Sequence, residues 1–235
     1  MPDEPWVLEP ASKMRKAIAR TMSLSARDIP QGTVELDVDV TETRAVIDRR
    51  REAGSATSLT DLIVAATARA LLAEPALNAS WADGEGIRRY RQVNIGLVYV
   101  KDDGLLIPVI HGAERLSVDE LTVSRKRLET AVRGGVVSMR DLSDATFTIS
   151  NLGPFGIPRF HALINPPQAG ILAVGAAAMR PVVRQGEFAA AEMLTLAVTV
   201  DHRVVDGVHA ARFLQELQRL LQRPADLVQP MECAS

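Results

Sequence analysis

Apolar side chains recur along the chain with two different periods, which predict strands in some segments and helices in others. The segment "GTVELDVDV" at residues 32–40 carries valine or leucine at every second position, which is typical of a strand with one solvated face. Met14, Ile18 and Met22 recur every fourth position, so a helix is expected there with Ser12 as its N-cap. Further strands are predicted at residues 93–100, 105–110, 146–150, 170–176 and 193–200.

The remaining helices are predicted from their capping residues and from the prolines and glycines that end them. Helices are expected from Thr41, from the capping pair Ser58 and Asp61 to Pro75, from Ser117 to about Gly134, and from about Gly207 to Gln222. Strands and helices therefore alternate irregularly. This order predicts an α/β fold with a mixed β-sheet and helices packed against it, in a single domain that spans residues 1–235 without repeat or linker.

Composition narrows the classes of partner. With 47% apolar residues the chain can bury a sizeable core, and its 27 basic and 29 acidic side chains nearly cancel, so neither nucleic acid nor a membrane is expected as a partner. The longest apolar run is too short to span a bilayer, and the first residues do not resemble a signal peptide. Cys233 is the single cysteine, which favours a reducing compartment, and a cytoplasmic location is expected.

Two segments concentrate residues that could carry chemistry. In "DHRVVDG", His202 follows the end of an apolar strand, where it could exchange a proton with a thiol, and Asp201, Asp206 or Arg203 could fix its orientation. An ordinary strand-to-helix turn with a solvated histidine explains the same pattern equally well. In "TISNLGPFGI", Ser150 closes a strand and could donate a hydrogen bond to an oxyanion. Taken alone, Ser150 fits better as an ordinary hydroxyl at a strand end.

Several segments together resemble a known family. They are "SKMRKAIARTM", "SLTDLIVAATARAL" with "NASW", "GLLIPVI", "TISNLGPFGI" with "INPPQ", and "DHRVVDG", in that order along nearly the whole chain. The chain resembles the catalytic domain of the dihydrolipoyl acyltransferases of 2-oxo acid dehydrogenase complexes, which share the fold of chloramphenicol acetyltransferase. The resemblance implies transfer of a short acyl group, with acetyl favoured, directly between the thiols of dihydrolipoamide and coenzyme A.

The resemblance also implies a role for each residue of the two segments. His202 would be the general base, Ser150 would stabilise the tetrahedral intermediate, Asp206 would support the histidine loop and Gly207 would open the following helix. Arg15, in the first helix, is the candidate for an ion pair with the aspartate of the motif. No metal is expected. The other histidines, His111, His161 and His209, are expected to have structural roles.

The same resemblance implies an assembly. In this family the histidine and the serine of one active site come from neighbouring subunits of a homotrimer, and trimers can join into cubic or dodecahedral cores. Expected partners are a lipoyl domain and the 2-oxo acid dehydrogenase and dihydrolipoamide dehydrogenase components. Neither a lipoyl domain nor a peripheral subunit-binding domain is recognised in the sequence, so the lipoyl group is expected on another domain or chain. Gln31 departs from the family, which often has histidine there, and the polar C-terminus "PADLVQPMECAS" leaves assembly beyond a trimer open.

Two other classes of function are compatible with these residues. Ser150, His202 and Asp206 could form the nucleophilic triad of a thioester hydrolase, although Ser150 does not lie in a G-x-S-x-G elbow. The chain could also be a structural core that organises dehydrogenase partners without transferring acyl groups. These alternatives stay open from the sequence.

Overall fold

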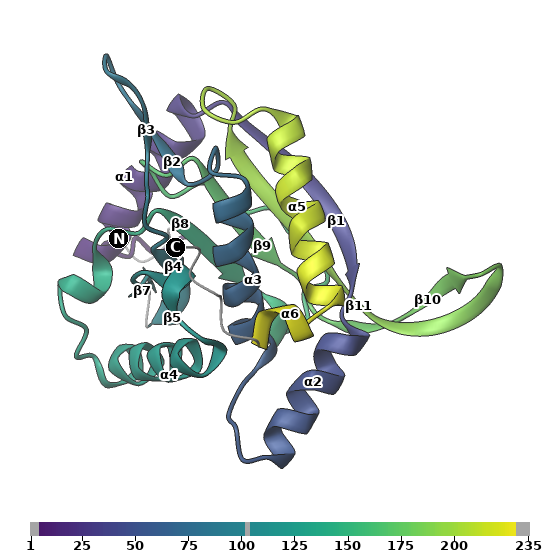
Figure 1. Ribbon diagram of the computed structural model, residues 1–235. Coiled ribbons are helices and arrows are strands. Elements are labelled where there is room, and N and C mark those ends of the chain that lie inside the picture. The colour runs from purple at the N-terminus through teal and green to yellow at the C-terminus, as the bar shows by residue number, and fades with distance from the viewer. Residues whose placement is uncertain (1–4, 102–103, 229–235) are drawn as a thin grey trace.

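A mixed β-sheet forms the centre of the computed structural model, which describes residues 5–101 and 104–228 (Figure 1). Its strands are β1 (Gln31–Asp39), β4 (Ile95–Leu97), β7 (Val109–Ile110), β8 (Phe147–Asn151), β9 (Gly170–Val174), β10 (Ala178–Arg184) and β11 (Glu187–Asp201). The order across the sheet is β1-β11-β9-β8-β4-β7, and β10 pairs with β11 alone. The strand β8 runs parallel to β4 and β9, and the other pairs are antiparallel. The predicted mixed α/β architecture is confirmed.

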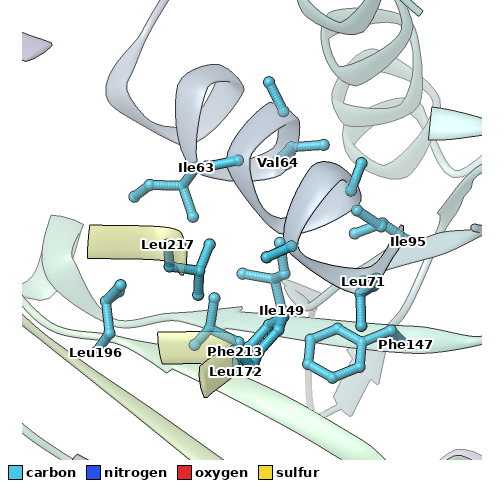
Figure 2. Packing of buried hydrophobic residues seen from close by; sticks show 14 of the residues in the cluster. Ile63, Val64, Leu71, Ile95, Phe147, Ile149, Leu172, Leu196, Phe213 and Leu217 are labelled. Carbon is cyan, nitrogen blue, oxygen red and sulfur yellow. The ribbon is translucent and has the colours of Figure 1, made fainter. Parts of the chain in front are cut away.

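The helices are α1 (Lys13–Asp28), α2 (Thr41–Glu52), α3 (Leu59–Ala73), α4 (Val118–Gly134), α5 (Gly207–Gln222) and the short α6 (Ala225–Val228). All of them except α1 contribute buried apolar side chains to one core, which lies on one face of the sheet. The helices α3 and α5 lie side by side over the centre of the sheet (Figure 1). Between them and the strands, Phe147 and Phe213 pack with ring centroids 5.6 Å apart, among leucine and isoleucine side chains (Figure 2). None of the described helices has the length and apolar character needed to cross a membrane.

Capping contacts confirm three of the predicted helix starts, those of α1, α3 and α4, whereas α2 begins at Thr41 itself, with Val40 in the N-cap position and no side-chain capping bond. The side chain of Ser12 accepts a hydrogen bond from the backbone of Arg15 at 3.0 Å. Ser58 with Asp61, and Ser117 with Glu120, form complete capping boxes at the starts of α3 and α4. These contacts join residues three positions apart, which is why the local sequence predicts them well.

The predicted strands at residues 93–100 and 105–110 are each divided in the structure. The first gives β4 in the main sheet and β5 (Tyr99–Lys101), which pairs with β6 (Gly104–Leu106) in a separate hairpin. The second is interrupted at Pro108, which has no backbone N–H to donate to a sheet. The hairpin of β2 (Ala79–Ala82) and β3 (Gly86–Arg89) was not predicted. The last strand is longer than predicted because β10 pairs along its first half, outside the main sheet.

The two faces of the sheet differ in chemistry because successive side chains of a strand point to opposite sides. The face under α3 and α5 carries aliphatic residues such as Val38 of β1 and Leu196 of β11, both fully buried. The opposite face carries Glu35 and Asp37 of β1, together with small or polar residues of the inner strands: Thr148, Ser150, Ala173, Ala197 and Thr199. We call the first the helix face and the second the open face, although Thr148, Ala173, Ala197 and Thr199 in its inner part are buried. The predicted half-solvated character of β1 is confirmed.

Candidate active site

The segment "DHRVVDG" forms a tight turn between β11 and α5. Asp201 ends the strand and is only 1% exposed, and its carbonyl accepts hydrogen bonds from the backbone of Val204 and Val205, each at 2.9 Å. Gly207 begins α5 as predicted, and Asp206 occupies the N-cap position, where its carbonyl accepts the backbone N–H of His209 at 3.0 Å. The turn therefore holds His202 at the junction of the last strand and the last large helix.

Asp201 and Arg203 interact with each other and not with the ring of His202. The Arg203 side chain donates to both carboxylate oxygens of Asp201, with the shortest contact at 2.7 Å from Nη2, and the Arg203 backbone N–H donates to Oδ1 at 3.0 Å. The carboxylate of Asp201 raises the pKa of Arg203. Neither side chain therefore orients the imidazole by a direct contact, because the two charges are bonded to each other.

His202 keeps its ring available. Its backbone N–H donates to the carbonyl of Pro30 at 2.9 Å, and its exposed side chain lies over Gly32 of β1, on the helix face. Within the described residues the imidazole forms no hydrogen bond. The other three histidines each have a partner: the carbonyl of Arg140 for His111, Glu35 for His161 and Glu74 for His209. His202 is therefore the histidine whose nitrogens are free to exchange a proton.

Ser150 lies near the end of β8, on the open face of the sheet. It pairs with Ala173 of β9, and it is one of the residues that line a cavity of about 600 Å³. Most of that lining is apolar, including Leu97, Val132 and Phe155. In the part of the chain that the structure describes, the Ser150 hydroxyl forms no hydrogen bond, so it is free to donate one to a ligand.

The structure does not bring Ser150 and His202 together within one chain. Across the sheet Ser150 is level with Ala173 and then with Ala197, five residues before His202. At strand spacings this is roughly 17 Å along β11 and another ~10 Å across two strands. The two side chains also point from opposite faces. A single chain therefore forms neither a serine–histidine pair nor a triad with Asp206.

Arg15 is also remote from the motif. It lies in the first turn of α1, where neighbouring Met14 packs against Gly104, whereas Asp28 at the other end of the helix is close enough to influence Arg203. The 13 positions between Arg15 and Asp28 span roughly 20 Å of helix. The predicted ion pair between Arg15 and the aspartate of the motif is thus not formed within one chain. Among the described residues no group of histidine, cysteine and carboxylate side chains could hold a metal ion.

Comparison with known proteins identifies the family. The family model described as 2-oxoacid dehydrogenases acyltransferase (catalytic domain) matches residues 4–229. The chain belongs to this family. It is 34% identical over 230 residues, 94% of its length, to the dihydrolipoyllysine-residue acetyltransferase component of the pyruvate dehydrogenase complex of Rickettsia bellii. It is also 34% identical over 224 residues, 93% of its length, to the corresponding component of the acetoin cleaving system of Bacillus subtilis. This acyltransferase domain covers 54% and 56% of those two relatives, so it spans about half their length.

Solved structures of the acyltransferase family share the fold. The dihydrolipoamide acetyltransferase of Azotobacter vinelandii superposes with a TM-score of 0.89 at 29% identity, over 97% of this chain and all of that one. The cubic core of a pyruvate dehydrogenase multienzyme complex gives 0.89 at 30% identity, over 97% and 100%. Chloramphenicol acetyltransferase, at 14% identity and a TM-score of 0.55 over 90% and 96%, shares the fold alone. The predicted resemblance is confirmed.

The Azotobacter protein offers a further comparison. A serine, a histidine and an asparagine have been investigated for their role in its catalytic mechanism. In that protein the histidine follows the serine by 52 positions (610 − 558) and the asparagine follows the histidine by four (614 − 610). Ser150, His202 and Asp206 have the same separations (202 − 150 and 206 − 202). The match in spacing is complete, and the residue type differs only at Asp206.

Proposed function

We propose that this protein transfers an acetyl or other short acyl group between the thiols of dihydrolipoamide and coenzyme A. The family assignment supports the reaction class, and both relatives described above are named acetyltransferases. The spacing of Ser150, His202 and Asp206 supports the site. Acetyl is the favoured acyl group because both relatives carry that name although they belong to different complexes.

In the proposed mechanism His202 is the general base. It accepts the proton of the attacking thiol, whose sulfur then forms a bond to the thioester carbonyl carbon. Ser150 donates a hydrogen bond to the oxyanion of the tetrahedral intermediate. When the intermediate collapses, the original carbon–sulfur bond breaks and His202 returns the proton to the departing sulfur, so that no proton is gained or lost. The free nitrogens of His202 and the free hydroxyl of Ser150 support this division of roles.

The observation that carries the proposal is the separation of these two groups within one chain. They lie at opposite ends of the sheet and on opposite faces, so a shared site requires that His202 of one copy meets Ser150 of another. A homotrimer provides three such sites through one repeated, head-to-tail contact. The pairing of Arg15 with the aspartate of the motif belongs to the same proposal, with the two residues coming from different copies.

The wider setting is proposed from the relatives. The lipoyl group would be carried on another domain or chain and presented to the site. The 2-oxo acid dehydrogenase and dihydrolipoamide dehydrogenase components would act before and after the transfer, in the cytoplasm. A cubic assembly of trimers is the larger form that the cubic-core neighbour favours.

Mixing two inactive variants tests the shared site. His202→Ala and Ser150→Ala chains are purified separately, then unfolded and refolded together in equal amounts, and acetyl transfer from acetyl coenzyme A to dihydrolipoamide is measured. Each variant alone is expected to be inactive. In the mixture about a quarter of the interfaces combine an intact His202 with an intact Ser150, so about a quarter of wild-type activity should return.

The same assay separates the alternatives. A hydrolase would release free acetate in place of acetyl dihydrolipoamide, and a burst of acylated Ser150 would precede steady state. A structural core would form the same assembly in the wild type with no turnover. Mixed chains that assemble but stay inactive, beside an active wild type, would contradict the shared site.

A further inference from the structure

The hairpin of β2 and β3 contacts the turn that carries His202. Trp81, in β2, has its indole ring under the guanidinium of Arg203, with 5.3 Å between Cζ and the ring centroid. The Nε and Nη2 atoms of the same guanidinium donate hydrogen bonds to the carboxylate of Asp201. Arg203 is therefore held between an aromatic face and a buried carboxylate that come from distant parts of the sequence.

The backbone also joins the hairpin to the end of β11. The N–H of Ala169 donates to the carbonyl of Ala79 at 2.8 Å, and the N–H of Asp201 donates to the carbonyl of Ala169 at 2.9 Å. Ala169 thus bridges the two segments, and the start of β2, two positions before Trp81, is fixed relative to Asp201. The indole itself is oriented by its N–H, which donates to Asp83 at 2.6 Å.

These contacts restrict His202 through both of its neighbours. Asp201 accepts hydrogen bonds from the side chain of Arg203 and from its backbone N–H, which is the first amide after His202. Water competes for the charged groups of an ion pair when the arginine is partly exposed, as Arg203 is, and this weakens the pair. An aromatic ring against the face of the guanidinium keeps water away from it. While Trp81 keeps Arg203 in place, the carboxylate of Asp201 stays bonded to the backbone that presents the imidazole.

We propose that Trp81 is a positioning residue for His202, acting through Arg203 and Asp201. The inference rests on the proposed acyl transfer, to which it adds a residue that touches neither thiol. Trp81 lies 121 positions (202 − 81) before His202 in the sequence, and its indole contacts Arg203 and donates to Asp83. Its contribution is to limit the orientations of the turn, and with them the orientations of the base.

The test compares two substitutions of Trp81 with one of Trp6, the other tryptophan of the chain, which is exposed. Trp81→Leu keeps an apolar side chain but removes the aromatic face, and kcat for acetyl transfer is expected to fall roughly 10-fold with KM for both thiols unchanged within about twofold. Trp81→Phe keeps an aromatic face and should retain kcat within about threefold. Trp6→Leu should match the wild type.

Hydrogen exchange measured on the same proteins adds a readout that does not depend on activity. In Trp81→Leu the amides of residues 203–205 should exchange faster, while those of the central strands β8 and β9 keep their protection. If Trp81→Leu proves too unstable to purify, Arg203→Lys is the second variant. It keeps the charge and loses the planar fork, and it should show the same fall in kcat and the same faster exchange.

Three results would overturn the inference in an active wild type. They are an unchanged kcat in Trp81→Leu, an equal loss in the Leu and Phe variants, and a loss that appears only as a raised KM. A wild type without transfer activity would contradict the proposed function instead, and the exchange measurement would then still decide whether Trp81 holds the turn.

Discussion

The two ends of the central sheet present their functional side chains in different ways. At the end of β11, His202 stands on a turn fixed by long-range contacts from the segment before β1, from the residues before β9 and from the β2–β3 hairpin. At the end of β8, Ser150 is part of a regular strand whose position follows from its pairing with β9. The comparison teaches that the position of the His202 imidazole depends on tertiary contacts of its turn, whereas the position of the Ser150 hydroxyl depends on the register of its strand.

The largest expected effects come from removing the two groups themselves. His202→Ala should lower kcat by about 10²- to 10⁴-fold, because no other described side chain lies over Gly32 to accept the proton. Ser150→Ala should lower kcat by about 10²- to 10³-fold, because one donor to the oxyanion is lost. Steady-state kinetics of acetyl transfer measure both, and size-exclusion chromatography should show unchanged assembly. A fully active His202→Ala protein would remove the mechanism.

A substitution at Gly32 should disturb the His202 end alone. A Cβ built on Gly32 would lie 3.4 Å from Cδ2 of His202, which is ordinary contact, so the branched side chain of Gly32→Val must displace the imidazole. We expect kcat to fall roughly 10-fold, with the free energy of unfolding changed by less than about 1 kcal/mol because valine favours strands.

Gly32→Ala is the matched control for that experiment, since its single methyl fits at the observed distance and should cost little activity. Steady-state kinetics and chemical denaturation measure the two effects. Wild-type kcat in Gly32→Val would show that the orientation of the ring over Gly32 has no bearing on transfer.

Asp206→Asn should have a smaller effect. The Azotobacter relative has asparagine at the same spacing, and asparagine is as good an N-cap residue as aspartate. Because the Asp206 side chain makes no capping hydrogen bond, kcat should stay within about threefold of the wild type and Tm should be almost unchanged. Asp206→Ala, which removes the polar group, should lose more activity than Asp206→Asn. An inactive Asp206→Asn protein would mean that the negative charge itself is required.

The smallest expected effect is a change in stability from a substitution at Asp141, away from both Ser150 and His202. Arg127 and Ser138 donate to the carboxylate of Asp141 and lower its pKa to about 2. A lowered folded-state pKa contributes stability above the unfolded value near 4, and this contribution is lost as the pH falls toward 2. Asp141→Asn should therefore be less stable than the wild type by about 1 kcal/mol at pH 6 and equally stable near pH 2.

Urea denaturation of both proteins at the two pH values measures this difference, and kcat near neutral pH should not change. A difference in stability that persists at pH 2 would show that the carboxylate charge is not its source.

Much of the architecture could be predicted because its signals are local. The capping boxes at Ser58 and Ser117 and the alternation along β1 depend on residues two to four positions apart. The divided strands were missed because their ends depend on pairing: β4 and β7 pair in the main sheet, whereas β5 and β6 pair with each other. The β2–β3 hairpin was missed although "NASW" was noted. The contact of Trp81 with Arg203 was missed as well, because nothing next to Trp81 in the sequence indicates it.

The sequence by itself determined the family and the two segments that carry chemistry, because residue types in a fixed order suffice to recognise them. It also determined the helix starts and the solvated face of β1. Only the tertiary structure decided that Asp201 and Arg203 satisfy each other, that the ring of His202 stays free, and that Ser150 lies at the far end of the sheet. The physical reason is that pairing of charges and distance between strand ends depend on register and packing, which bring together residues far apart in the chain.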